Sequence, residues 1–156
     1  MRKVLFILLL AGIFGAAMAG AGSLIHLELI DHGILANGDG LAGKSVQIGQ
    51  RTERVPGREG LAFGMVFRLM GERVESDIAY QTEITFRRAQ GVPQDGSPRF
   101  RLAKTRHSRL GETEALWHRL TREQAAVPGQ WLLRISHEGR VLLEKTFLVE
   151  PEQPTE

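Results

Sequence analysis

The sequence has no cysteine in its 156 residues. This absence excludes a disulfide scaffold, a zinc site built from thiolates, a cysteine nucleophile and a lipid-modified cysteine anchor. Aromatic residues are scarce at 6%, which argues against a stacking platform for single-stranded nucleic acid. Hydrophobic residues make up 42% of the chain and charged residues 24%, a balance typical of one folded domain rather than a disordered chain.

Long apolar runs are equally rare, since the only one lies at the N-terminus. Arg2-Lys3 precedes an apolar run over residues 4–14, which is shorter than the roughly 20 residues that a membrane-spanning helix needs. Ala17-Met18-Ala19 then fits a signal-peptidase site with cleavage after Ala19, and Ala19-Gly20-Ala21 offers a second cleavage position after Ala21. We therefore expect a signal peptide over residues 1–19 and a periplasmic or secreted protein, with an uncleaved membrane anchor as the alternative. Neither a multispanning membrane segment nor a nucleic-acid partner is expected.

The remaining chain alternates between apolar and polar residues with a period of two, which is typical of strands with one buried face. Gly- and Pro-rich turns separate about seven such stretches, with Asp31-His32-Gly33 as a candidate bulge in the first and His137–Arg140 as a hairpin connection near the end. This pattern predicts an all-β, antiparallel, immunoglobulin-like sandwich over residues 25–150, followed by a polar tail at 151–156.

One stretch, residues 112–126, has two readings. Leu116, Leu120 and Gln124 share one face if the stretch is a single helix. Alternatively, residues 115–120 form a strand, and a helical turn follows with Thr121 as its cap and Gln124 reaching back. We favour the strand and turn, and the helix stays open as the alternative.

Several short motifs resemble a known group of proteins. They are Gly33-Ile34, Leu61-Ala62-Phe63-Gly64-Met65, Val127-Pro128-Gly129-Gln130-Trp131 and Lys145-Thr146-Phe147-Leu148-Val149. Together they resemble an uncharacterised bacterial domain-of-unknown-function family of exported, single-domain immunoglobulin-like β-sandwich proteins. The resemblance covers about residues 25–150. It implies the sandwich fold and implies no reaction, cofactor or catalytic residue.

No catalytic, cofactor or metal site emerges from the motifs. The histidines show no H-x-x-x-H or H-E-x-x-H spacing, and no serine lies in a G-x-S-x-G elbow. His26 or His32 with Met65 or Met70 is a weak metal-binding hypothesis. For the two tryptophans, core packing is favoured over ligand stacking; they are Trp117 and Trp131.

Charge is distributed unevenly along the chain. The overall net charge is +2, but removing the predicted signal peptide leaves equal numbers of acids and bases. From Arg87 to Arg109 the sequence contains seven bases and a single acid, Asp95. The regions before and after this segment each contain more acids than bases. These candidate anion-binding residues are Arg87, Arg88, Arg99, Arg101, Lys104, Arg106 and Arg109.

The alternation of charged and apolar residues changes within the basic segment, which suggests a break in its strand. Arg99 and Arg101 alternate with Phe100 and Leu102, whereas Lys104 and Arg106 have the parity of the apolar pair, so we expect the strand to end or bulge near Ala103. The bases are either neutralised by neighbouring acids or form an anion-binding surface.

These observations favour a non-catalytic binding domain exported to the bacterial cell envelope, with an envelope component or a protein as its partner. An anionic partner would bind the basic face. The alternatives are a hydrolytic enzyme with a site built from loops, and a protein that docks partners through an exposed strand edge. The sequence specifies no ligand, reaction or oligomeric state.

Overall fold

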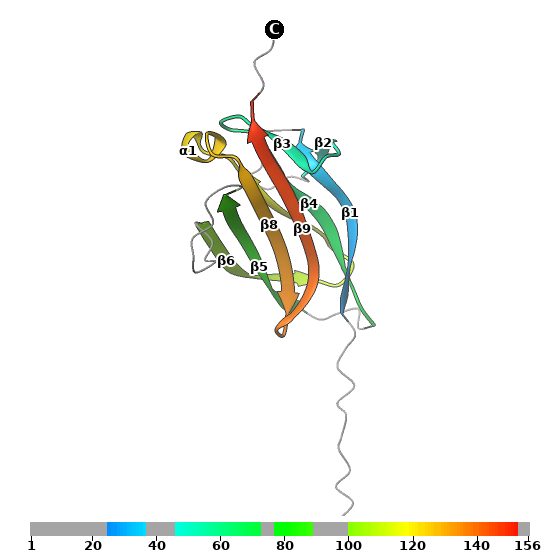
Figure 1. The fold of residues 1–156 in the computed structure, drawn as a ribbon. Helices are drawn as coiled ribbons and strands as arrows, with labels where there is room; N and C mark the ends of the chain where they lie inside the picture. The colour runs from blue at the N-terminus through cyan, green and yellow to red at the C-terminus, as the bar shows by residue number, and fades with distance from the viewer. Residues whose placement is uncertain (1–24, 37–45, 73–76, 89–99, 153–156) are drawn as a thin grey trace, which may run out of the picture.

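The computed structural model describes residues 25–36, 46–72, 77–88 and 100–152, and these form two β-sheets packed face to face (Figure 1). Strand order in the first sheet is β2 (Ile48–Gln50), β1 (His26–Leu35), β4 (Ala62–Met70), β7 (Thr113–Arg119). Strand order in the second is β3 (Arg54–Gly57), β9 (Arg140–Pro151), β8 (Gly129–His137), β5 (Asp77–Arg88), β6 (Phe100–Arg109). The predicted signal peptide at 1–19 and all but the first two residues of the predicted tail lie outside these ranges.

The core lies between the two inner sheet faces and follows the predicted alternation. Phe63, Met65 and Phe67 of β4 are almost fully buried, and so are Trp131 and Leu133 of β8. In β8 these residues alternate with more exposed ones, as the two-residue period of a strand requires, whereas the central strand β4 is buried on both faces over most of its length. The cluster is completed by residues from both sheets: Ile25, Val55, Leu69, Ile78, Tyr80, Ile84, Phe86, Leu116, Leu120, Ala125, Ile135, Phe147 and Val149.

The first strand carries a bulge one residue before the predicted one. The register of β1 against β4 shifts between Leu29 and Asp31, which leaves Ile30 without a partner and 41% exposed. Because one extra residue inverts the parity of a strand, Leu29 lies opposite core residue Phe67, whereas Ile34 lies opposite core residue Phe63. The bulge thus keeps both halves of the strand facing the core.

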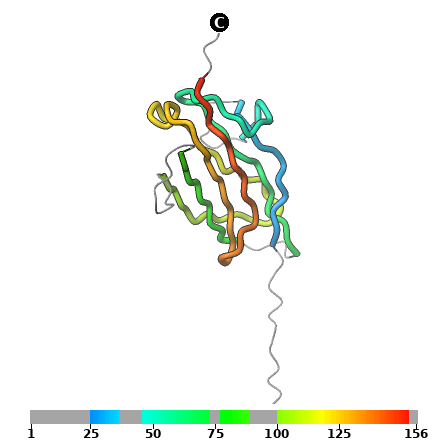
Figure 2. The backbone as a smooth tube through the Cα atoms, viewed as in Figure 1, coloured from blue at the N-terminus to red at the C-terminus, as the bar shows by residue number. Residues whose placement is uncertain are grey.

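The chain passes from one sheet to the other between β2 and β3 (Figure 2). β2 pairs with β1, and β3 pairs in parallel with the final strand, Arg54 opposite Leu148 through Gly57 opposite Pro151. The described residues form nine strands, against about seven expected. Among them, β3 was not expected, because a strand of four residues leaves too little alternation to detect.

Residues 112–126, for which the sequence allowed either one helix or a strand and a turn, form a strand followed by a helical turn. β7 ends at Arg119, and the one-turn helix α1 spans Arg122–Ala125. Thr121 caps it: its side chain accepts the Gln124 N–H, and the Gln124 side chain accepts the Thr121 N–H, a capping box. The favoured prediction is therefore confirmed. In the described part of the chain, no helix has the length and apolar character to cross a membrane.

The C-terminal hairpin is tighter than the predicted connection. His137 and Arg140 already form a strand pair, so only Glu138 and Gly139 make the turn. Both have positive φ, 50° and 77°. This is the conformation that a two-residue turn needs to match the twist of its strands.

Candidate functional site

One lateral opening of the sandwich lies between β6 and β7, which are consecutive in the chain and form one edge of each sheet. Leu110 to Glu112 connects them, so the chain moves from one sheet edge to the other there. Between these strands runs a hollow of about 320 Å³, here called the β6–β7 groove. It is lined by Thr82, Ile84, Leu102, Lys104, Arg106, Leu116, Trp117, His118 and Arg119.

The β6 strand is regular along its whole length, which corrects the expected end or bulge near Ala103. It pairs with β5 without a register shift, from Phe86 opposite Phe100 to Asp77 opposite Arg109. Polar residues can occupy its core-facing positions because β6 is an edge strand whose inner face borders the groove rather than the closed core. No bulge is needed to expose them.

Register divides the predicted bases between two faces of β6. Lys104 lies opposite buried Thr82 and Arg106 opposite buried Tyr80, so both start on the inner face and line the groove. Arg101 lies opposite Thr85 at the alternate parity, on the outer face. Arg109 shares that outer parity. Sequence neighbours thus form two rows of charge along one edge.

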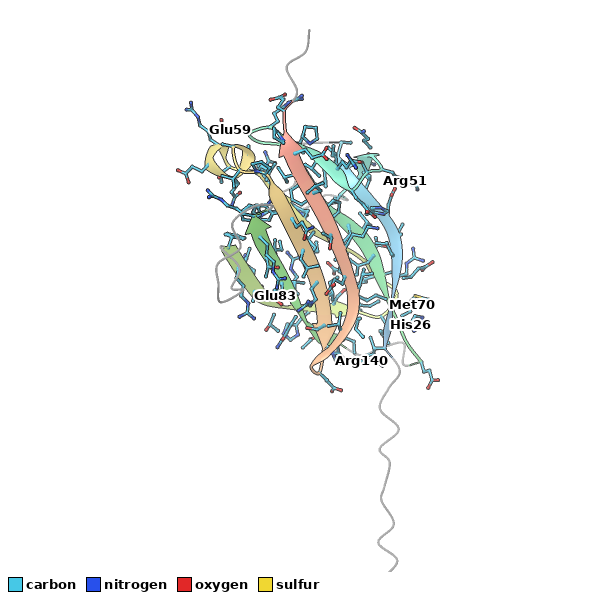
Figure 3. The ribbon with its side chains drawn as sticks, viewed as in Figure 1. His26, Arg51, Glu59, Met70, Glu83 and Arg140 are labelled. Atoms are coloured by element: carbon cyan, nitrogen blue, oxygen red, sulfur yellow. The ribbon has the colours of Figure 1, made fainter. Side chains whose placement is uncertain are left out.

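Two of the predicted bases have partners. The Arg101 guanidinium donates to the Glu83 carboxylate at 2.6 Å, and the same carboxylate lies 3.7 Å from Arg134 (Glu83 is labelled in Figure 3). Arg106 donates to the carbonyl of Ala115 at 3.2 Å, which links the edge of one sheet to the edge of the other. Arg101 is therefore neutralised, whereas Arg106 meets a neutral oxygen.

The other described bases make no ion pair with any described residue. These side chains are Arg87 and Arg88 at the end of β5, Lys104 in the groove and Arg109 at the far end of β6; Arg99 lies outside the described residues. From Phe100 to Arg109 the strand extends about 30 Å. The predicted cluster is thus a row along an edge, not one compact pocket.

His118, which lines the groove, is part of an aromatic stack. The His118 imidazole stacks on the Trp131 indole and lies 5.5 Å from the centroid of the Phe100 ring. Its Nε2 donates to the Gln124 side-chain oxygen at 2.9 Å. Burial lowers the pKa of His118, and the hydrogen bond to Gln124 opposes that effect. Burial thus favours the neutral imidazole, so the cationic character of the groove comes from lysine and arginine.

His118, Tyr80 and Arg119 were not predicted as site residues. A signal for His118 existed, since it shares strand parity with apolar Leu116 and Leu120. Burial, reinforced by the Glu114 carboxylate and opposed by Arg106, raises the pKa of Tyr80 to about 12. Its hydroxyl is buried without a hydrogen-bond partner.

The two tryptophans differ in position. Trp131 lies in the core with no exposed surface, as expected. Trp117 is only partly buried and lies opposite Gly64, at the parity that faces away from core neighbours Leu116 and His118, which corrects its expected core position. A Cβ on Gly64 would lie 2.6 Å from the Trp117 Cβ. The glycine in this central strand thus makes room for the tryptophan.

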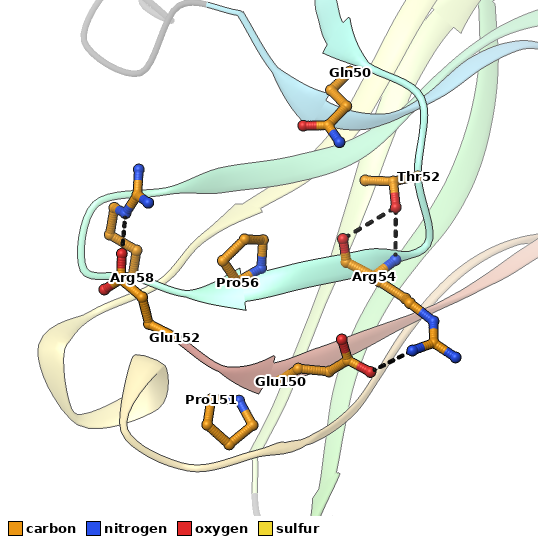
Figure 4. A pocket seen from close by; sticks show the side chains of 8 residues that line it. All are labelled: Gln50, Thr52, Arg54, Pro56, Arg58, Glu150, Pro151 and Glu152. Carbon is orange, nitrogen blue, oxygen red and sulfur yellow. Dashed lines mark hydrogen bonds and ion pairs between the residues drawn. The ribbon is translucent and has the colours of Figure 1, made fainter. Parts of the chain in front are cut away.

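A second hollow, of about 700 Å³, lies beside β3 at the opposite edge of the second sheet (Figure 4). Its two guanidinium groups are already paired: Arg54 donates to Glu150 at 3.0 Å and Arg58 to Glu152 at 2.8 Å. Both pairs are exposed to solvent. Because its cations are satisfied internally, this hollow is a weaker candidate for an anion than the β6–β7 groove.

Charged groups also close the side of the sandwich near β9. Lys145 occupies a core-facing position opposite Leu133 and reaches the Glu53 carboxylate at 2.5 Å. Hydrogen bonding to Lys145 lowers the pKa of Glu53. The Arg51 guanidinium, bonded to Asp31 at 2.8 Å, likewise lowers the pKa of that carboxyl group.

The structure places each histidine of the metal-binding hypothesis opposite a methionine on the neighbouring strand. His26 lies opposite Met70 and His32 opposite Met65 in the β1–β4 register, and Figure 3 shows His26 and Met70 near one another. Met65 is buried in the core. Among the residues that the structure describes, no three His, Cys, Asp or Glu side chains gather where they could hold a metal ion.

The fold is an immunoglobulin-like β-sandwich of two sheets. In the second sheet the final hairpin is flanked by β5 and β3, and β3 pairs in parallel with β9. A crystal structure of an immunoglobulin-like protein from Pseudomonas aeruginosa is similar, with a TM-score of 0.59 and 23% identity, covering 84% of this chain and 100% of that chain. The predicted fold class is confirmed.

A beta-glucosidase from Kluyveromyces marxianus aligns with a TM-score of 0.39 and 11% identity, covering 82% of this chain and 14% of that chain, which is too weak a similarity to carry an argument. No protein-family model matches the sequence, and no curated protein matches it. Membership of the uncharacterised bacterial family therefore stays a prediction.

Proposed function

We propose that this chain is a non-catalytic binding domain, exported to the bacterial cell envelope, that takes an anionic partner along its β6 edge. The immunoglobulin-like fold supports a binding role, because such sandwiches present edges and loops on a rigid scaffold. The N-terminal pattern around Ala17-Met18-Ala19 supports export.

The observation that carries the proposal is the state of Lys104. Its side chain is exposed on the edge strand, lines the groove and pairs with no acid of the described chain. Arg101 has Glu83 instead, and the cations at the opposite edge have Glu150 and Glu152. Internal acids therefore neutralise Arg101 and the two cations at the opposite edge, whereas the charge of Lys104 stays available to another molecule.

Binding to anionic probes tests this proposal. The purified protein is passed over immobilised polyphosphate, phosphatidylglycerol vesicles and polyglutamate at low and high salt. We expect retention on at least one probe at low salt and its loss at high salt, because exposed charges are screened. Charge reversal in the double variant Lys104→Glu/Arg109→Glu abolishes retention.

A matched control separates this effect from net charge. Arg54→Glu/Arg58→Glu makes the same charge change at the opposite edge strand, and we expect it to leave retention almost unchanged. Equal loss in both double variants, or no retention on any of the three probes, contradicts the proposal. Circular dichroism of each variant shows whether the sandwich still folds.

Export is tested separately. The protein is expressed from its full coding sequence in a Gram-negative host, and the periplasmic fraction and culture medium are analysed by mass spectrometry. A chain beginning at Gly20 or Gly22 supports the predicted cleavage after Ala19 or Ala21. A full-length chain held in the membrane fraction supports the uncleaved anchor instead.

A further inference from the structure

The β6 strand is an open edge. It pairs only with β5 among the described residues, and seven of its ten residues are exposed. In an antiparallel pair, alternate residues direct both backbone N–H and C=O away from the partner strand. Such a row of unpaired groups is a template for a further strand.

A second copy of this chain is a poor occupant of that edge. Antiparallel pairing of two β6 strands would bring Lys104 and Arg106 of one copy close to the same row of the other. Arg101 and Arg109 would meet the like-charged row on the outer face. Like charges across a strand pair are destabilising, so the charge pattern opposes self-association through this edge.

We propose that the anionic partner is an acidic, extended polypeptide segment that adds to β6 as a further strand of the second sheet. This inference rests on the proposed function and specifies its ligand. Backbone hydrogen bonds to the edge would supply affinity, and alternate side chains would supply specificity. Carboxylates opposite Lys104 and Arg106 would meet the two cations of the groove face.

The groove face also indicates where the added strand should carry an apolar residue. Leu102 has the same parity as Lys104 and is 38% exposed, which is unusual for a side chain directed between two sheets. An apolar side chain on the added strand would cover it. The groove-facing residues of the ligand should therefore be one apolar and two acidic residues at alternate positions.

The probe is the heptapeptide Thr-Glu-Thr-Glu-Thr-Leu-Thr with acetyl and amide ends, tested together with its reverse sequence. Its matched control carries N-methyl groups on alternate backbone nitrogens, which removes donors but keeps every charge. We expect the control to bind at least about tenfold more weakly, because main-chain hydrogen bonds carry this mode of recognition. Alternate β6 amides should exchange more slowly with the unmodified peptide bound.

Variants identify the side chains involved. Lys104→Gln should weaken peptide binding several-fold and Lys104→Glu more strongly, whereas Arg54→Gln at the opposite edge should leave it unchanged. Replacing Leu by Asn in the peptide should weaken binding to the unmodified protein but cost less against Leu102→Ala. Thermal unfolding of each variant confirms that the sandwich is intact.

The outcomes distinguish this inference from the proposed function. Equal binding of the peptide and its N-methylated control overturns strand addition but leaves an anion-binding surface. Retention on polyphosphate or phosphatidylglycerol vesicles without peptide binding assigns the surface to another class of anion and also overturns the inference. Binding of no anionic probe removes both proposals.

Discussion

The imidazole of His118 stacks on the indole of Trp131, with ring centroids 4.4 Å apart and planes inclined by 25°. This contact joins the edge strand of one sheet to a central strand of the other. It places a titratable ring in an aromatic environment, between Phe100 and the Phe63 side of the core. The stability of the sandwich should therefore depend on the protonation of this ring.

The first prediction concerns that dependence. Since burial lowers the pKa of His118 in the folded protein, the unfolded chain binds the proton more readily. The contribution of His118 to stability is present above its ordinary pKa of about 6.5 and is lost as pH falls from there through the lowered value. Urea unfolding at pH 7.5 and pH 5.5 measures the loss.

His118→Phe keeps an aromatic ring and removes the titration, so its free energy of unfolding should change less over the same interval. His26→Gln, at an exposed position of β1 that makes no ion pair with a described residue, is the matched control and should keep the dependence of the unmodified protein. An unchanged pH dependence in His118→Phe would show that another group is responsible.

The second prediction concerns Gly64 in the central strand β4. An added Cβ would lie 2.3 Å from the Leu116 carbonyl oxygen and 2.6 Å from Trp117 Cα, both backbone atoms that cannot move aside alone. Gly64→Ala should lower the free energy of unfolding by about 2–3 kcal/mol through overpacking. Gly71→Ala, where the nearest atoms are flexible side-chain carbons of Leu110 at 3.2 Å, should cost less than about 1 kcal/mol. Similar costs for both variants would refute this explanation.

The third prediction concerns the capping box of α1. Thr121→Ala removes one cap bond and should cost about 1 kcal/mol in unfolding free energy. Gln124→Ala should cost more, about 2 kcal/mol, because it also leaves the half-buried His118 N–H without its acceptor. Glu123→Ala, an exposed change in the same turn, should cost only a few tenths. Chemical unfolding ranks the three variants, and a reversed order of the first two contradicts the role of Gln124.

The fourth prediction concerns the hydroxyl of Tyr80. It is buried without a hydrogen-bond partner, and such a group contributes a desolvation cost without a compensating bond. Tyr80→Phe should therefore leave the melting temperature unchanged or raise it. The same substitution would lower the melting temperature if the hydroxyl formed a bond that stabilises the fold. Tyr80→Leu, which also removes ring contacts with Phe67, should be clearly destabilising.

Alternation along the chain was enough to predict the sandwich, because each long strand buries one face. Ile78, Tyr80, Ile84 and Phe86 have the same parity in the sequence, and all four are buried. The Thr121 cap was also predictable, since a capping box is local chemistry between residues three apart. Turn residues marked the final hairpin for the same reason.

The site could not be predicted as fully, because its geometry depends on which strands form sheet edges. Lys104 at a core-facing position suggested a broken strand, whereas β6 stays regular because its inner face borders an open groove. Trp117 was expected in the core, and only the register with Gly64 reveals that it lies on the outer face. Whether Arg101 is free or paired with Glu83 likewise depends on two segments being neighbours.

The parallel pairing of β3 with β9 has a mechanical consequence. β1 begins at one end of the sandwich and β9 finishes at the other (Figure 1), so tension applied between the two ends of the folded unit acts along the strands. The hydrogen bonds that hold β9 between β3 and β8 are then loaded in shear and must break together rather than one by one. Resistance to stretching along this axis therefore depends on how many of the β9 hydrogen bonds share the load.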